Sequence, residues 1–377
     1  MAIDTRGEKR IMYYQRRITG LQQRLRRRRL DGIIIARPEN RRYLSGYKGG
    51  DHGIEESSGL LIVPAKGAAH LVTDFRFELQ AQQETKDIMV HVHRGGVIQL
   101  LGQLLPDLSI KRFGFESDYT LYFFAEKLKK ELRPKGISPV PVQGLVEQMR
   151  IVKDEQEIAL IKKSVQLNEA VFSSVFNELG AYRTERELAA AIESAMVRQG
   201  AEKPSFSTIV ASGRNGALPH AVPGTDRIEQ NGSLTIDMGL ILNGYCSDMT
   251  RNFVPQEPDS TYRKLHRIVR KAQLAGIAAV KAGARCCDID RAARAVIKDA
   301  GYGNYFGHSL GHGVGLAVHE EPRVSAKSRR KLKAGMVITI EPGIYIPDWG
   351  GIRLENMVVV TSDGCENLNE DTTMLDI

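Results

Sequence analysis

Cysteine is scarce in this chain, with four residues among 377, and two of them, Cys286 and Cys287, are adjacent. Adjacent cysteines do not suit a disulfide framework, and a chain of this length can bury a core without one. Long apolar runs are also absent, because no stretch approaches the roughly 20 residues that a bilayer-spanning helix needs. The arginine-rich start is not followed by the apolar segment of a secretory signal. We therefore expect a cytoplasmic protein with reduced thiols.

Excess positive charge is confined to one segment. Residues 1–42 hold 13 of the 53 basic residues and 4 of the 45 acidic ones, so the remainder of the chain is nearly neutral. The excess culminates in four consecutive arginines, Arg26 to Arg29, on an expected helix over 10–30. Basic helices can bind phosphates or anionic membrane surfaces, but no aromatic side chains are interleaved with the arginines from Arg24 to Arg29. We expect a solvated helix face rather than a nucleic-acid or membrane partner.

The pattern of elements predicts two domains. Strands alternating with helices over 1–133 predict a small α/β domain. A stretch rich in proline and glycine follows, which predicts a linker over 134–150. From 151 to 377, long helices with acidic first turns are succeeded by strand-like apolar runs, which predicts a mixed α+β domain.

Five possible metal ligands are dispersed over the second domain: Asp237, Asp248, His312, Glu341 and Glu355. The segment 233–254 is typical of a hairpin with an Asn-Gly turn, which would bring the two aspartates together. Glycines surround the histidine, where they let backbone and ligand approach closely. Four carboxylates and one imidazole suit two divalent ions that share bridging carboxylates, activate a water and polarise a carbonyl.

In this order and at these spacings, the five residues resemble the ligand set of the pita-bread metallopeptidases, the superfamily of methionine aminopeptidase, aminopeptidase P and prolidase. The resemblance runs from about residue 151 to the C-terminus. Three further histidines, His220, His308 and His319, resemble those of its proline-directed branch, the Xaa-Pro aminopeptidases and Xaa-Pro dipeptidases. In the first domain, residues 40–47 resemble the N-terminal domain of creatinase, prolidase and aminopeptidase P.

The resemblance implies two divalent metal ions per subunit and a role for each ligand. Asp237 would chelate the first ion, and Asp248 and Glu355 would bridge both. His312 and Glu341 would complete the second site. Carboxylate-rich ligation favours manganese, although cobalt or zinc can occupy the same cage.

Catalytic roles follow for the remaining candidates. Glu341 is the expected general acid/base, because a carboxylate beside the attacking water can relay its proton to the leaving amine. Glu355 is the less favoured alternative, since a bridging carboxylate has both oxygens occupied. His319 is assigned to the oxyanion that forms on the scissile carbonyl, and His220 to positioning the substrate. In the resembling enzymes, the counterpart of His308 walls the proline pocket.

Arg353 stands two residues before Glu355 and has two interpretations. It could pair with a ligand carboxylate, or it could meet a carboxylate of the substrate. The sequence leaves both open.

The reaction implied is metal-assisted hydrolysis of the bond between an N-terminal residue and proline. Whether the chain is a dipeptidase or an aminopeptidase stays open, because the two differ in whether the site closes behind proline.

A methionine aminopeptidase is disfavoured by the first domain. A non-peptidase of the same fold, a creatinase-like enzyme or a binding scaffold, is the alternative of a different class, although such members lack the full ligand set. The resemblance also implies a homodimer.

Overall fold

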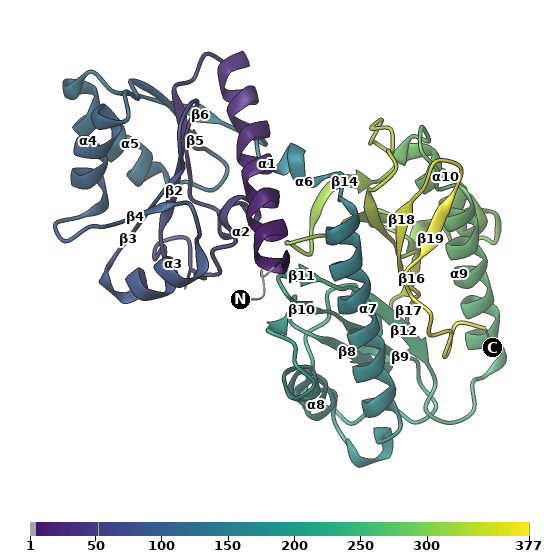
Figure 1. The fold of residues 1–377 in the computed structure, drawn as a ribbon. Coiled ribbons are helices and arrows are strands. Elements are labelled where there is room, and N and C mark those ends of the chain that lie inside the picture. The colour runs from purple at the N-terminus through teal and green to yellow at the C-terminus, as the bar shows by residue number, and fades with distance from the viewer. Residues whose placement is uncertain (1–4, 52, 377) are drawn as a thin grey trace. The chain divides into compact units, whose positions relative to one another are not determined.

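The computed structural model describes residues 5–51 and 53–376 and divides the chain into two compact units, Met1–Met149 and Arg150–Ile377 (Figure 1). No helix in the described part of the chain is long and apolar enough to span a bilayer.

The N-terminal unit is a mixed six-stranded sheet in the order β4-β3-β2-β1-β5-β6. Its strands are β1 (Gly32–Ile35), β2 (Leu60–Pro64), β3 (His70–Thr73), β4 (Met89–Val92), β5 (Arg112–Glu116) and β6 (Ser138–Val142). Its helices are α1 (Thr5–Arg27), α2 (Pro38–Ser45), α3 (Glu78–Glu84), α4 (Val97–Asp107) and α5 (Tyr122–Leu132), with 3-10 turns η1 (Phe75–Phe77) and η2 (Arg133–Lys135). The short helix α6 (Glu147–Arg150) ends at the first residue of the C-terminal unit. Figure 1 shows the sheet between α4 and α5 on one face and α1 and α2 on the other. The predicted α/β domain is confirmed.

Part of the segment expected as a linker, 134–150, is instead a strand. Residues 138–142 form β6, which runs parallel to β5 at the edge of the sheet. Pro139 and Pro141 lie opposite Phe113 and Phe115 in this pair. Proline is tolerated on an edge strand where its missing N–H would point away from the neighbouring strand. The proline content that indicated a linker therefore marks a sheet edge.

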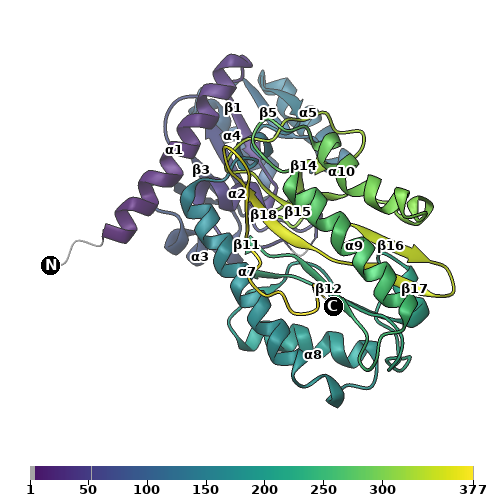
Figure 2. The same ribbon diagram turned by 90° about the vertical axis from the view of Figure 1, so that its right-hand side faces the viewer.

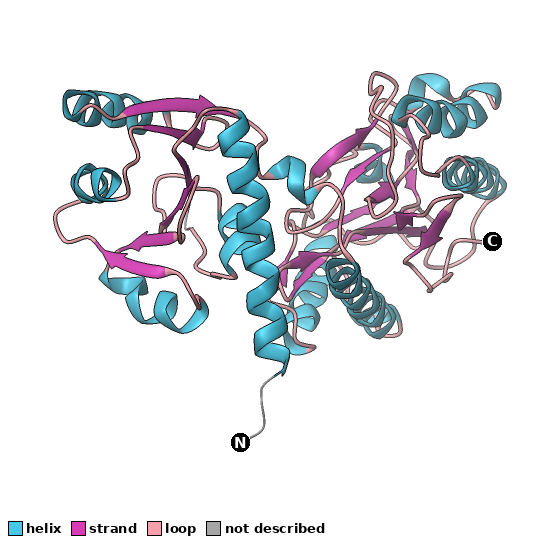
Figure 3. Ribbon diagram, turned by 45° about the horizontal axis from the view of Figure 1, so that its top comes forward, coloured by secondary structure: helices cyan, strands magenta, loops and turns pink. Residues whose placement is uncertain are grey.

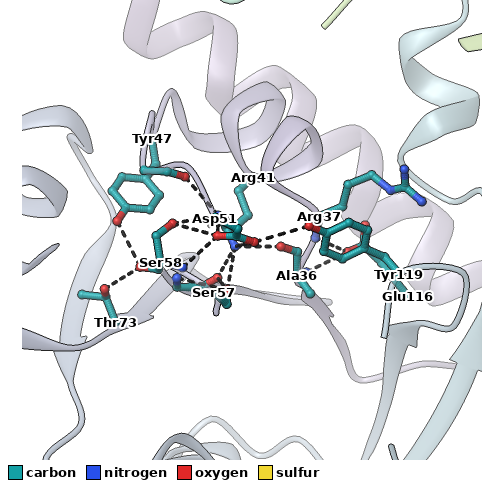
Figure 4. Close-up of polar contacts among 12 residues, drawn as sticks. Ala36, Arg37, Arg41, Tyr47, Asp51, Ser57, Ser58, Thr73, Glu116 and Tyr119 are labelled. Atoms are coloured by element: carbon teal, nitrogen blue, oxygen red, sulfur yellow. Dashed lines mark hydrogen bonds and ion pairs between the residues drawn. The ribbon is translucent and has the colours of Figure 1, made fainter. Parts of the chain in front are cut away.

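A buried arginine organises the loop between α2 and β2 in the N-terminal unit. Arg41 is fully buried, and its guanidinium pairs with Asp51 at 2.7 Å while donating to the backbone oxygens of Ala36, Gly49 and Gly59. Figure 4 shows Arg41 among its partners Ala36, Asp51 and Ser58. A buried charge is tolerated only when it is paired and hydrogen-bonded, as here. The loop is therefore fixed from inside the unit.

The C-terminal unit has its strands inside and its helices outside (Figure 3). Its helices are α7 (Glu155–Phe176), α8 (Glu185–Arg198), α9 (Ser260–Ala278) and α10 (Cys286–Asp299), with 3-10 turns η3 (Leu179–Ala181), η4 (Gly213–Ala217) and η5 (Gly303–Tyr305). Its first strands are β7 (Lys203–Pro204), β8 (Ile209–Ser212), β9 (Leu234–Met238), β10 (Leu240–Leu242), β11 (Tyr245–Cys246) and β12 (Met249–Phe253). The later strands are β13 (Gly311–Gly313), β14 (Glu320–Val324), β15 (Val337–Ile340), β16 (Gly343–Ile346), β17 (Gly350–Arg353), β18 (Asn356–Val360) and β19 (Cys365–Asn367).

This unit is built from two halves, each a helix pair packed on strands. One apolar core joins α7 and α8 to β8, β9 and β12. The other joins α9 and α10, which lie side by side in Figure 2, to the sheet β14-β13-β15-β18-β19 and to β16 and β17. The predicted mixed α+β organisation is confirmed. Capping boxes at Asp154 and Thr184 start α7 and α8.

The buried His266 on α9 makes the stability of this unit sensitive to acid. The ring is buried, and its Nε2–H donates to the carbonyl oxygen of Met374 at 3.0 Å. Burial lowers its pKa to about 4, below the value of about 6.5 in an unfolded chain. The unfolded state therefore binds the proton first, and stability falls as the pH drops from about 6.5 towards 4.

We expect His266→Gln to reduce this acid sensitivity. Glutamine can keep a donor near Met374 but does not titrate. Between about pH 7 and 5, the wild type should lose about 2 kcal/mol that the variant does not lose, measured by denaturant unfolding. Equal pH slopes for the two proteins would contradict the assignment.

Candidate metal centre

The predicted hairpin is present, but its arms are broken in the middle. The turn residues Asn243 and Gly244 have φ values of 52° and 87°, the positive pair that a tight hairpin turn requires. Next to the turn β10 pairs with β11, and farther out β9 pairs with β12. The break falls at Gly239, where a Cβ atom would overlap the carbonyl oxygen of Ser247. Only glycine therefore lets the two arms approach here.

The break places both aspartates in one region. Asp237 lies on β9 opposite Thr250 of β12. Asp248 comes directly before β12, and both carboxylates are buried. Both ligand candidates of the first half thus lie next to the break.

The other three candidates lie on or beside strands of the second half. His312 is the middle residue of β13, a strand between β14 and β15. Glu341 follows β15, and Glu355 precedes β18. The N–H of Glu355 donates to the carbonyl oxygen of Thr250 at 3.2 Å, which ties the second half to the first beside the aspartates.

The candidate ligand atoms converge. One ligand atom each of Asp248, His312 and Glu355 lies within 4.8 Å of the others. His312 Nε2 lies 3.6 Å from Asp248 Oδ2 and 3.4 Å from Glu341 Oε1. Asp237 contributes a further buried carboxylate, which raises the pKa of Asp248 and Glu355 through its charge. The structure thus brings all five sequence-predicted ligands together.

The imidazole of His312 is prepared to bind through Nε2. Its Nδ1 lies 3.1 Å from the carbonyl oxygen of Gly313, and a carbonyl only accepts, so Nδ1 carries the proton. Burial and the neighbouring His319 lower the pKa of His312 to about 4. The ring is therefore neutral near pH 7, with the Nε2 lone pair available to a metal.

Two carboxylate oxygens show that the residues fit a cation. Asp237 Oδ1 and Glu355 Oε1 are buried and accept no hydrogen bond from any described residue. Buried oxygens are normally hydrogen-bonded, and each exception needs an explanation. Oxygen-rich sites with an added imidazole suit divalent ions such as manganese. A pair of such ions would satisfy both oxygens.

The carboxylates also repel one another. Burial, and then the charge of Glu355, raise the pKa of both Asp248 and Glu341 well above the usual range. Burial and the charge of Asp237 raise the pKa of Glu355 to about 8. Like charges this close are stable together only when a counter-charge is present.

Arg353 supplies part of that counter-charge. Its Nη2 donates to Asp237 Oδ2 at 2.7 Å, which is the first of the two arrangements considered for this arginine. Its Nη1 donates to the hydroxyl of Tyr345 at 2.8 Å, and that hydroxyl lies 2.9 Å from His308 Nε2. His308 Nδ1 donates to Ser309, so Nε2 accepts from the tyrosine. A continuous chain of hydrogen bonds therefore fixes His308 relative to Asp237.

The other two histidines border the centre and are exposed. His319 stands edge-on to the ring of His312, with 4.4 Å between the ring centroids. Burial, followed by the charge of His220, lowers the pKa of His319. His220 also contributes to the lowered pKa of His308, whose main cause is burial. All three histidines therefore lie around one side of the candidate site.

Sequence reasoning missed the residues that hold the ligands. Thr250 donates to Glu355 Oε2 at 2.6 Å and accepts from Arg353 Nε at 3.1 Å. Thr339 donates to Glu341 Oε1 at 3.1 Å. Thr250 follows Asp248 by two residues and Thr339 precedes Glu341 by two, positions on the same face of a strand as the ligand. That spacing is a signal that could have found both threonines, whereas nothing in the sequence singled out Tyr345.

Comparisons with known proteins agree with this fold. Residues 159–362 match the model of metallopeptidase family M24, and residues 17–152 match the creatinase/prolidase N-terminal domain. The chain belongs to metallopeptidase family M24: it has the pita-bread catalytic domain of that family, preceded by a creatinase-type domain.

Within the family, its similarity is to proline-directed peptidases. The chain is 37% identical over 341 residues to a Xaa-Pro dipeptidase of Pyrococcus horikoshii, covering 90% of this chain and 93% of that one. Its fold matches a Xaa-Pro dipeptidase of Bacillus anthracis with a TM-score of 0.87 at 35% identity, covering 95% and 98% of the two chains. It also matches an X-Pro aminopeptidase of Thermotoga maritima with a TM-score of 0.83 at 35% identity, covering 91% and 96%.

Proposed function

We propose that this chain hydrolyses the peptide bond between an N-terminal residue and proline, using two divalent ions held by Asp237, Asp248, His312, Glu341 and Glu355. The observation that carries the proposal is the pair of buried carboxylate oxygens, on Asp237 and Glu355, that accept no hydrogen bond within the described part of the chain. They lie beside the unprotonated Nε2 of His312. The similarity to Xaa-Pro dipeptidases and an X-Pro aminopeptidase supports the choice of substrate. Manganese is the ion proposed, because most of the ligands are carboxylates.

The ions would polarise the scissile carbonyl and make a water acidic enough to attack it near neutral pH. Glu341 accepts the proton of the attacking water and returns it to the proline nitrogen, which must be protonated to leave. His319 donates a hydrogen bond to the carbonyl oxygen as negative charge develops there.

The remaining residues bind and orient the substrate. His220 positions the N-terminal side of the scissile bond, and His308 forms part of the wall of the proline pocket. Arg353 holds Asp237 in place and, through Tyr345, fixes His308. Proline needs such a dedicated pocket because its tertiary amide has no N–H to donate.

A homodimer is the proposed assembly, and a monomeric mass in light scattering at working concentration would count against it.

The test uses metal-stripped protein resupplied with manganese and compares Ala-Pro, Ala-Pro-Ala and Ala-Ala-Ala. We expect cleavage only where proline is second, and no turnover before metal is added. Cleavage of the dipeptide alone would define a dipeptidase, and cleavage of the tripeptide an aminopeptidase. Binding of the ions without cleavage of any of these peptides would refute the proposal and favour a binding scaffold.

A further inference from the structure

Glu320 is a buried acid directly after His319, and the proposed chemistry does not use it. Its side chain is 7% exposed. One carboxylate oxygen pairs with Arg150, and the other lies 3.1 Å from Lys153 Nζ. Burial alone would raise its pKa, but the charges of Lys153 and Arg150 outweigh burial and lower the pKa to about 2. The group is therefore a permanent anion between two cations.

This anion holds the turn that carries His319, residues 314–319, which we call the His319 turn. Glu320 Oε1 accepts from the N–H of Ala317 at 3.1 Å, so the carboxylate folds back over the turn. It also packs against Gly315, where a Cβ atom would lie only 2.7 to 2.9 Å from the carboxylate. The other side of the turn is tied to β11, since the N–H of Cys246 donates to the carbonyl oxygen of Gly315 at 2.8 Å.

Lys153, one of the two cations, is itself fixed to the framework of the C-terminal unit. The N–H of Lys153 donates to the carbonyl oxygen of Gly335 at 2.8 Å. Val152 forms a β-bridge with Met336, and Asp154 caps α7. The segment 152–154 is thus tied to the framework of the unit, and through Lys153 the carboxylate anchors the His319 turn to it.

We propose that Glu320, clamped by Arg150 and Lys153, is a positioning residue that sets the place of the His319 side chain beside the metal centre. The inference rests on the role proposed for His319 in the reaction. An oxyanion donor acts only if it is already in place when charge develops, and a displacement of about 1 Å can cost about 100-fold in rate. His319 is exposed and has a ring contact with His312, so the place of its side chain depends on how its backbone is held.

The neighbouring Glu321 provides a matched control. It carries the same side chain one residue further on, but its ion pair with Arg330 is long, at 3.4 Å, and 51% of its side chain is exposed. Surface pairs of this kind contribute little. Glu321→Gln makes the same chemical change as Glu320→Gln without touching the His319 turn.

The kinetic experiment is a double-mutant cycle on the manganese-loaded protein with Ala-Pro and Ala-Pro-Ala. We expect Glu320→Gln to lower kcat about 10-fold or more with little change in KM, and Glu321→Gln to change neither. His319→Ala should lower kcat about 100-fold. In that background, Glu320→Gln should lower kcat by less than about threefold, because the residue through which it acts is gone. If the two substitutions acted independently, so that their fold losses in kcat multiplied in the double variant, the proposal would be overturned.

A second readout needs neither metal nor substrate. Amide hydrogen exchange in the metal-free protein should show at least about 10-fold faster exchange at Gly315 and Ala317 in Glu320→Gln, and no change in Glu321→Gln. Unchanged exchange in Glu320→Gln would also overturn the proposal. If that variant does not fold, Lys153→Met and Gly315→Ala loosen the same clamp. Lys153→Arg, which keeps the positive charge that Lys153→Met removes, should preserve the slow exchange and the wild-type kcat. Failure of the wild type to cleave the peptides would refute the proposed function, while the exchange result would still decide whether the clamp exists.

Discussion

Replacing Asp248 by asparagine should abolish hydrolysis while stabilising the metal-free protein. The carboxylate is buried beside Glu355, Asp237 and Glu341, and all three raise its pKa. With ions bound, its charge is needed, and its loss should lower both metal content and activity, the latter by about 10³-fold or more. Without ions, the same charge is repelled by its neighbours and poorly solvated. A neutral amide removes this cost, so the free energy of unfolding of the metal-free protein should rise.

The stabilisation should depend on pH in a defined direction. A carboxyl whose pKa is raised by folding ionises more readily in the unfolded chain, so metal-free wild type should lose stability as the pH rises from about 5 to 9. Asp248→Asn should lose less stability over the same pH range, measured by denaturant unfolding in the presence of a chelator. Asp259→Asn is the matched control, because Asp259 only caps α9 and asparagine caps equally well. Lower stability of metal-free Asp248→Asn at every pH would contradict the account of the centre.

Glu341→Gln should separate chemistry from metal binding. The glutamine keeps a carbonyl oxygen to bind an ion and to accept from Thr339, as Glu341 Oε1 does at 3.1 Å. It cannot take up the proton of the attacking water. We expect kcat to fall about 10³-fold with at least one ion still bound, because general acid–base catalysis contributes about 10² to 10⁴ in rate.

The same measurements on Glu355→Gln distinguish the two candidates for this role. Glu355 has one oxygen that accepts from Thr250 and one that accepts no hydrogen bond from the residues described, which suits a bridging ligand. Its replacement should lower the metal content measured by elemental analysis together with the activity. If Glu355→Gln kept both ions and lost turnover, whereas Glu341→Gln stayed active, the general acid/base role would belong to Glu355.

Local signals were sufficient for much of the fold. The Asn-Gly pair predicted the turn at Asn243 because a tight hairpin needs two positive φ angles, which this pair adopts readily. The capping box of Thr184 and Glu187 fixes the start of α8 through similarly local contacts. The metal ligands are dispersed over more than 100 residues, and only their resemblance to a known family order joined them before the structure did.

The support of the site could not be predicted from sequence. Arg353 reaches Asp237 across 116 residues, and Glu320 reaches Arg150 across 170, contacts that only tertiary packing creates. Composition was also misleading at 134–150, since proline is common both in linkers and on sheet edges.

The prolines of β6 have a consequence for the behaviour of the N-terminal unit in concentrated solution. In a parallel pair, alternate residues direct their backbone groups to the same neighbour, and Ser138 donates to Lys111 on the β5 side. Pro139 and Pro141 therefore stand where the N–H groups of β6 would point outwards. A strand from another molecule finds no donors at these two positions, so this edge resists intermolecular pairing and the aggregation that begins with it.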